Sequence, residues 1–246
     1  MTVPAERVEQ ARARMLELFP EGFEEVDSSG SVELVAYTDP GGEERLWHVF
    51  GGARAQDVAA DWRDRWKAFH QPVQIGPLWI GPPWAEAPAG ASTVVIEPGR
   101  AFGTGAHPTT QQCVELLLEL DRGSVVDLGC GSGVLSIAAA KLGFGPIVAL
   151  DADSHAVEST RANVAANDVD VDVSVADILT VELPHTDLAI ANITRKTLEA
   201  LAPRLHSQRL IGSGYLPTEA TELAGYRHVR RVTRDSWAAD VYEAAE

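Results

Sequence analysis

The chain has 246 residues, of which 45% are hydrophobic and 23% are charged, as in an ordinary globular protein. Its formal net charge of −16 argues against a general nucleic-acid-binding surface, which would be basic. It lacks a signal-peptide pattern and a long apolar run, and its two cysteines suit a reducing cytosol. We therefore expect a monomeric, cytoplasmic protein that contacts neither membranes nor nucleic acid directly.

Residues 1–70 predict a small α+β domain. Apolar residues recur at helical spacing in Arg7–Phe19 and again in residues 58–69, so each stretch predicts a helix. Turn-forming residues, with Gly, Pro and Asp among them, flank the short apolar stretches between these helices. Those stretches predict three strands: Phe23–Val26, Ser31–Tyr37 and Leu46–Phe50.

Residues 71–92 are unusually rich in proline and glycine. A residue that precedes proline is disfavoured in a helix, so this composition predicts an extended chain. Val73–Ile75 and Leu78–Ile80 are apolar enough to form short pieces of strand. We expect this segment to be a linker between two domains.

Residues 93–246 alternate between apolar strands and helical patterns, which predicts an α/β domain with a doubly wound parallel sheet and helices on both faces. The chain should end in an antiparallel hairpin. The predicted strands are Thr93–Ile96, Val125–Leu128, Ile147–Leu150, Val171–Val175, Leu188–Ala191 and Arg209–Gly212, with hairpin strands Val229–Thr233 and Trp237–Tyr242. The predicted helices are Thr110–Leu120 (capped by Thr109 or Thr110), Val134–Leu142, His155–Asn167, Arg195–Leu205 and Pro217–Leu223.

A glycine-rich loop follows the strand that ends at Leu128. Glycines stand at positions 129, 131 and 133, and a backbone without Cβ atoms lets a ligand approach closely. Asp151 ends the next strand, where an acidic side chain is placed to bind a ribose diol. Together, Gly129, Gly131 and Asp151 predict a binding site for an adenosine cofactor.

The glycine spacing helps to identify this cofactor. Dinucleotide sites use G-x-G-x-x-G, whereas this loop is G-x-G-x-G, and no Lys-Ser or Lys-Thr follows it as in a P-loop. Asp127 precedes the first glycine and would repel a phosphate, but it suits a ligand that carries an ammonium and a sulfonium. The loop therefore predicts S-adenosylmethionine rather than NAD. Cys130, inside the loop, is interpreted as a small residue rather than a nucleophile.

Two polar residues follow later strands of the predicted sheet. Asn192 stands at the tip of the predicted strand Leu188–Ala191, where its carbonyl can accept a hydrogen bond from a reacting amine. The alternative is an asparagine that turns the chain. Asp177 follows the predicted strand Val171–Val175 and can accept a hydrogen bond from the adenine amine. A simple turn residue is an equally good interpretation. We take Asn192 as the catalytic candidate and as a cofactor contact.

The segment Glu97–Thr110 is a glycine-rich loop that leads into a predicted helix. It predicts a cover over the cofactor, with Phe102 against the methyl donor and Thr110 bonded to the cofactor carboxylate. His107 is a candidate base, although a histidine before proline in such a loop favours a structural role.

These stretches resemble the ribosomal protein L-eleven methyltransferase family (PrmA), whose catalytic domain is a Rossmann-like class I methyltransferase. The matching segments are Glu97–Thr110, Asp127–Ala139, Ala191–Ile193, Asp61–Lys67, Pro72–Gly76 and Leu78–Ile80. The first of these is more specific than the glycine loop, which many class I methyltransferases share. The resemblance covers the chain from about residue 57 to its C-terminus.

The resemblance implies transfer of methyl groups to lysine side chains and the N-terminal amine of a ribosomal protein. The N-terminal module of the family docks that substrate, and the linker lets the catalytic domain reach several amines. Cofactor contacts of the family correspond to Thr110, Gly129, Asp151 and Asn192.

The chain departs from the family pattern in two places. Residues 1–56 do not match the family, and we expect no strand before Arg7, where members of the family have one. Thr194 stands where the family commonly has leucine. The alternative functions are therefore a methyltransferase for another protein or small molecule, and a cofactor-binding protein without transferase activity. A nicotinamide dehydrogenase is a further alternative that the glycine spacing disfavours.

Overall fold

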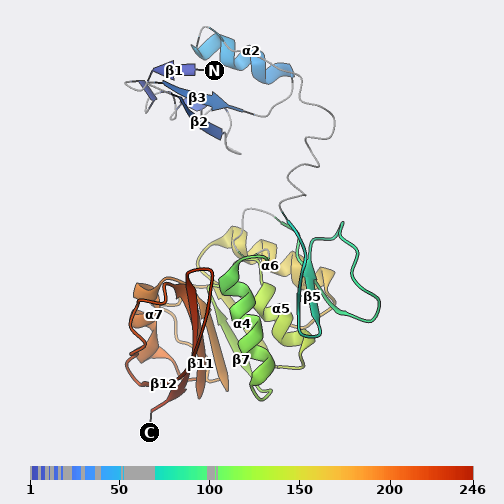
Figure 1. Ribbon diagram of the computed structural model, residues 1–246, viewed down its shortest axis with the longest axis vertical. Helices are drawn as coiled ribbons and strands as arrows, with labels where there is room; N and C mark the ends of the chain where they lie inside the picture. Colours follow the sequence, from blue (N-terminus) through green and yellow to red (C-terminus); the bar gives the residue numbers. More distant parts are fainter. Residues whose placement is uncertain are drawn as a thin grey trace. The chain divides into compact units, whose positions relative to one another are not determined.

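The computed structural model describes residues 2–4, 7, 8, 11, 14, 15, 18, 24–28, 31–36, 40–50, 52, 70–98, 103 and 105–245. The predicted helix over residues 58–69 and the candidate residue Phe102 lie outside this part of the chain. The protein divides into two compact units, Met1–Arg63 and Asp64–Glu246, and each is described by itself (Figure 1).

In the smaller unit, three short strands form an antiparallel sheet in the order β1-β3-β2, and a helix follows them in the chain. These elements are β1 (Thr2–Pro4), β2 (Glu24–Ser28), β3 (Ser31–Val35) and α2 (Pro40–Phe50). Strand β1 precedes Arg7, where we expected no strand, so that prediction is wrong. The strand has three residues, which is too short for an alternating pattern to be recognised.

The predicted strand Leu46–Phe50 is also wrong, because these residues form the end of α2. Leu46 and Phe50 are four residues apart and pack against the same small core, which includes Met15 and Leu34. Trp47 lies between them in sequence and is exposed. A short apolar stretch does not distinguish helical from strand spacing by itself.

In the larger unit, the predicted linker, residues 71–92, contains two strands of a small sheet. Strands β4 (Val73–Ile75) and β5 (Leu78–Gly81) pair antiparallel, and β5 pairs parallel to β6 (Ser92–Val95). Leu78 and Ile80 are buried in the same core as the helices of the larger unit. This segment therefore packs within the larger unit, and the first predicted strand of the main sheet belongs to this small sheet instead.

The main sheet of the larger unit has, among the described residues, seven strands in the order β12-β13-β11-β10-β7-β8-β9. The strands are β7 (Val125–Leu128), β8 (Ile147–Asp151), β9 (Asp172–Val175), β10 (Leu188–Asn192), β11 (Arg209–Tyr215), β12 (Tyr226–Arg234) and β13 (Trp237–Ala244). The helices are α4 (Pro108–Glu119), α5 (Val134–Lys141), α6 (Ser154–Ala166), α7 (Arg195–Leu201) and the 3-10 turn η3 (Ala202–Arg204).

The pairing of these strands confirms the predicted α/β fold class, a doubly wound sheet with a C-terminal antiparallel hairpin. Strands β11, β10, β7, β8 and β9 are parallel, whereas β13 runs antiparallel to both β11 and β12. The strand order reverses between β7 and β10. Ligands of such sheets bind at the carboxyl ends of the strands beside this reversal.

Successive residues of the strands face opposite layers of the domain. Val125 lies in a core shared with α4 and α5, whereas Val126 lies in a second core shared with α7. Figure 1 shows α4 and α5 lying across strands of the sheet. Because both faces of the central strands are covered, their sequences are almost continuously apolar.

Two helix predictions need correction. The predicted helix Pro217–Leu223 is wrong, because these residues form turns and irregular chain. Arg231 of β12 donates to the carbonyl oxygens of Pro217 and Glu219, which an α-helix would use for its own bonds. Helix α4 begins at Pro108 and is capped by His107, whose ring accepts from the Thr109 backbone, rather than by a threonine.

Gly214 allows β11 to pass directly beside the chain that leaves β10. Its φ of 99° is in the left-handed region, and a Cβ added there would lie 2.3 Å from the Ile193 carbonyl oxygen. We expect Gly214→Ala to lower the thermal unfolding temperature more than Gly225→Ala. Gly225 is the control, with φ of 80° and no atom within 4 Å of an added Cβ. Its replacement by alanine therefore has only the backbone cost of about 1–2 kcal/mol. Equal shifts of the two variants would contradict the proposed close approach.

Candidate functional site

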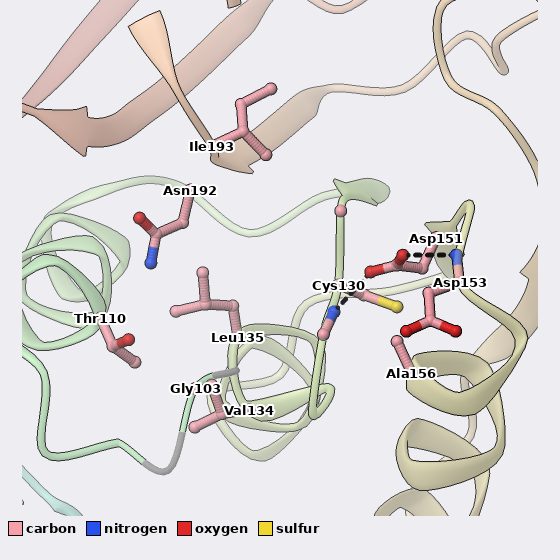
Figure 2. A pocket seen from close by; sticks show the side chains of 12 residues that line it. Gly103, Thr110, Cys130, Val134, Leu135, Asp151, Asp153, Ala156, Asn192 and Ile193 are labelled. Carbon is pink, nitrogen blue, oxygen red and sulfur yellow. Dashed lines mark hydrogen bonds between the residues drawn. The ribbon is translucent and has the colours of Figure 1, made fainter. Parts of the chain in front are cut away.

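A pocket of about 360 Å³ opens at the carboxyl ends of β7, β8 and β10, where the strand order reverses. Figure 2 shows Asn192 and Thr110 on one side of it and Asp151 and Asp153 on the other. Its lining residues are Gly103, Thr110, Gly129, Cys130, Gly131, Val134, Leu135, Asp151, Asp153, Ala156, Asn192 and Ile193. The pocket therefore brings together five of the predicted site residues: Thr110, Gly129, Gly131, Asp151 and Asn192.

The glycine loop between β7 and α5 needs glycine for conformation and for space. Gly129, Gly131 and Gly133 all have positive φ, which residues with a side chain rarely adopt. A Cβ at Gly133 would lie 2.7 Å from Thr160 Cγ2, and one at Gly129 would lie 2.9 Å from Ile193 Cγ2. The backbone of the loop thus lies against neighbouring elements and leaves its other side open to the pocket.

Asp151, at the end of β8, holds this loop in place. One carboxylate oxygen accepts from the Gly131 backbone N–H at 2.9 Å, and the other accepts from the Asp153 N–H at 3.0 Å. Asp153 in turn caps α6 by accepting from the His155 N–H. The Asp151 side chain is only partly buried, so its carboxylate also reaches the pocket.

Asp127 lies beneath the loop and is not among the residues that line the pocket. It is 1% exposed and accepts a hydrogen bond of 2.6 Å from the Ser136 hydroxyl on α5. Burial raises the pKa of Asp127 to about 6; the Ser136 hydrogen bond opposes this shift, and the negative charge of Asp151 adds to it. Burial thus disfavours the charged form of Asp127 beneath the loop, and Asp151 is the carboxylate of this pair that faces the pocket.

The structure does not bring Asp177 into the pocket. Its side chain is exposed and accepts from the Leu179 N–H at 3.0 Å, while its carbonyl oxygen accepts from the Thr180 N–H. These bonds stabilise the turn that follows β9.

Asn192, at the end of β10, presents its amide to the pocket. Its Nδ2 atom donates to Thr109 Oγ1 at 3.2 Å, and that hydroxyl lies 2.7 Å from His107 Nδ1. His107 packs edge-on against Trp237 with ring centroids 5.1 Å apart, and its burial lowers its pKa. A neutral His107 ring therefore caps α4 and takes part in this hydrogen-bond chain. Thr194, where the family commonly has leucine, caps α7 through its hydroxyl.

Sequence reasoning did not single out several lining residues, including Val134, Leu135, Asp153 and Ala156. Val134 and Leu135 form the first turn of the helix directly after the loop, so their position in the motif is the signal that could have identified them. Burial raises the pKa of the Cys130 thiol to about 12, which keeps it neutral and unreactive. This agrees with its interpretation as a small residue of the loop.

Thr110 has an unusual environment for a polar side chain. Its side chain is fully buried, and its hydroxyl oxygen has no hydrogen-bond partner among the described residues. Buried hydroxyls are normally paired, so an unpaired one in a pocket wall marks a position for a ligand atom. The polar chemistry of the wall thus includes the backbone of three glycines, two carboxylates, an amide and a hydroxyl that has no partner among the described residues.

Comparison with known proteins confirms the family resemblance but corrects its extent, because the match includes most of residues 1–56, which we expected not to match. The family described as ribosomal protein L11 methyltransferase (PrmA) matches residues 6–239. The chain belongs to this family. A relative of that name from Myxococcus xanthus is 43% identical over 180 residues, which is 69% of this chain and 62% of the relative. Another from Shewanella sp. (strain ANA-3) is 40% identical over 182 residues, covering 68% and 60%.

A solved structure supports the same relationship. The crystal structure of a ribosomal protein L11 methylase from Lactobacillus delbrueckii subsp. bulgaricus has a TM-score of 0.63 and 26% identity, covering 72% of this chain and 100% of that one. The match with the curated relatives spans about three fifths of their length. Within the described residues, no helix is long and apolar enough to cross a membrane, and no cluster of three metal-binding side chains is present.

Proposed function

We propose that this protein is an S-adenosylmethionine-dependent N-methyltransferase that modifies lysine side-chain and N-terminal amines of a large-subunit ribosomal protein. The relatives carry the name of ribosomal protein L11, which is therefore the first substrate to test. The observation that carries the proposal is the pocket that combines the G-x-G-x-G loop, the Asp151 carboxylate and the Asn192 amide.

The pocket wall fits S-adenosylmethionine in chemical type. The Asp151 carboxylate suits the ribose diol, the backbone at Gly129 and Gly131 allows close approach, and the unpaired Thr110 hydroxyl suits the cofactor carboxylate. Asp127 and Asp151 together favour a ligand with an ammonium and a sulfonium over a pyrophosphate. When bound, this cofactor supplies an activated methyl group on sulfur. We retain Phe102 as a proposed contact to the methyl donor. Asp177 lies outside the lining of this pocket, so its proposed contact to the adenine requires the cofactor to extend beyond the pocket.

Asn192 is proposed as the catalytic residue. A lysine amine has an ordinary pKa of about 10.4, so it must lose a proton before its lone pair can attack. The Asn192 Nδ2 atom is occupied by Thr109, which leaves the Oδ1 atom to accept a hydrogen bond from the neutral amine. Such a bond would hold the nucleophile in one orientation, and orientation is a large part of the rate enhancement in a direct displacement.

We further propose that the protein acts as a cytoplasmic monomer, with residues 1–70 as the substrate-docking domain. We propose residues 71–92 as the linker, although part of this segment packs within the larger unit. Residues 93–246 then form the cofactor-binding domain. The net charge of −16 would attract a basic ribosomal protein and disfavour direct contact with nucleic acid.

Thr110→Val tests the assignment of the unpaired hydroxyl. The change removes a buried polar atom that has no partner among the described residues, so the free energy of unfolding should stay the same or rise slightly. The dissociation constant for S-adenosylmethionine should increase roughly tenfold, as expected for a lost hydrogen bond to a charged group. Thermal unfolding and calorimetric titration measure the two effects. Unchanged affinity would remove Thr110 from the cofactor site.

The cofactor assignment is tested by titrating the full-length protein with S-adenosylmethionine and with NAD. We expect a single site for S-adenosylmethionine and a much weaker response to NAD. Tighter binding of NAD would support a dehydrogenase instead. Tight binding of S-adenosylmethionine without turnover on any amine would support a cofactor-binding protein that lacks transferase activity.

The chemical class of acceptor is tested with an acetylated substrate. Ribosomal protein L11 whose lysine amines have been acetylated should accept methyl groups only at a free N-terminal amine. Unchanged transfer to the acetylated protein would exclude lysine side chains as acceptors. No transfer to untreated L11, with methylation of another molecule, would support the alternative of a different substrate.

A further inference from the structure

The hydrogen bonds around Asn192 determine which of its amide atoms faces the pocket. The Thr109 backbone N–H donates to His107 Nδ1 at 3.3 Å, so that ring nitrogen acts as an acceptor. The Thr109 hydroxyl lies 2.7 Å from the same nitrogen and must therefore donate its own hydrogen to it. The hydroxyl oxygen is then free to accept from Asn192 Nδ2 at 3.2 Å.

These hydrogen bonds all point in one direction, because Asn192 donates to Thr109 and Thr109 donates to His107. An asparagine side chain can otherwise present either its oxygen or its nitrogen to a ligand by rotating through half a turn. With Thr109 accepting from Nδ2, the reverse orientation would place the Asn192 oxygen against a hydroxyl oxygen whose hydrogen already bonds elsewhere. The hydrogen bonds among these three residues therefore select the orientation of the amide that leaves the Asn192 oxygen as an acceptor.

Burial and position separate Thr109 from the residues that can touch a ligand. Thr109 is 1% exposed and, unlike Asn192, is not among the lining residues of the pocket. The contact joins α4 to the end of β10 across 83 positions in the sequence. His107 is in turn held by its packing against Trp237 of the hairpin. The residues that orient the amide thus come from α4 with its N-cap and from the C-terminal hairpin, behind the pocket wall.

We propose that Thr109 is a positioning residue, which uses the His107 ring to hold the Asn192 amide so that its oxygen accepts from the reacting amine. This inference rests on the proposed function, because it assigns the orientation of a group that the methyl-transfer reaction uses. Thr109 does not itself contact the substrate.

The test compares Thr109→Val with Thr109→Ser in the full-length protein. Valine keeps the volume and loses the hydroxyl, whereas serine keeps the hydroxyl. We expect the valine variant to lower kcat for methylation of ribosomal protein L11 by about tenfold, with the dissociation constant for S-adenosylmethionine within about twofold of the wild type. The serine variant should retain most of the kcat. Equal losses in the two variants would overturn the inference.

A double-mutant cycle distinguishes action through Asn192 from a general structural role. In an Asn192→Ala background, Thr109→Val should cause almost no further loss of kcat, because the group that it orients is gone. A tenfold loss in both backgrounds would overturn the inference.

A readout without turnover separates this inference from the proposed function. In an NMR spectrum of the labelled wild-type protein, the Asn192 side-chain NH2 signals should show slow hydrogen exchange, and Thr109→Val should make that exchange fast. Unchanged exchange would contradict the inference even in an active enzyme. An inactive wild-type protein with the expected exchange would contradict only the proposed function.

Discussion

Asp151→Ala should weaken binding of S-adenosylmethionine by about 5–150-fold, which corresponds to a loss of about 1–3 kcal/mol. The carboxylate would lose its proposed bonds to the ribose diol. It would also release the Gly131 and Asp153 backbone N–H groups that it holds at 2.9 and 3.0 Å. Because one side chain both contacts the ligand and shapes the loop, we expect a larger effect on affinity here than at any other acidic residue of the site.

Calorimetric titration measures this effect, and Asp172→Ala provides the matched control. Asp172 is also an acidic residue of the sheet, but it is exposed and does not line the pocket. The control should bind the cofactor as the wild type does. Wild-type affinity in Asp151→Ala would remove the assignment of this residue to the ribose.

Asn192→Ala should lower kcat by on the order of 10²-fold, while the cofactor dissociation constant changes by much less. The proposed bond from the amine to Asn192 Oδ1 orients the nucleophile in the transition state, so its loss affects turnover more than binding. Methylation kinetics on ribosomal protein L11 measure kcat, and titration with S-adenosylmethionine measures the dissociation constant.

Asn192→Asp is an informative companion variant. It keeps oxygen acceptors at this position but removes the NH2 group that donates to Thr109. We expect partial activity, with less constraint on the orientation of the amine. If Asn192→Ala instead reduced cofactor affinity and kcat by the same factor, the residue would be a cofactor contact only.

The sheet and the glycine loop could be predicted from the sequence because their signals are local. Three glycines with positive φ follow one strand, and an acidic residue ends the next, all within about one β-α-β unit. Parallel strands then bring Gly129, Asp151 and Asn192 to the same edge of the sheet without further information. The family match over residues 6–239 agrees with these segments.

Other features depend on contacts between distant residues, which spacing does not reveal. Asp127 lies one residue before the end of β7, and the sequence does not show that its side chain faces Ser136 rather than the pocket. The bond from Asn192 to Thr109 joins residues 83 positions apart. The Pro217 carbonyl oxygen accepts from Arg231, which lies on a strand later in the chain. Each of these required the folded structure.

Errors in the N-terminal unit have a different cause, which is the shortness of the elements. Strand β1 has three residues, and the apolar residues at the end of α2 span little more than one helical turn. In such short stretches, the spacing of apolar residues fits a strand and a helix equally well.

The central claim is tested most directly by incubating the purified full-length protein with labelled S-adenosylmethionine and unmodified large-subunit ribosomal proteins, followed by intact-mass analysis. We predict mass gains in whole methyl units on one protein, ribosomal protein L11. No mass gain on any of these proteins, with cofactor binding confirmed separately, would contradict the assignment of a ribosomal substrate.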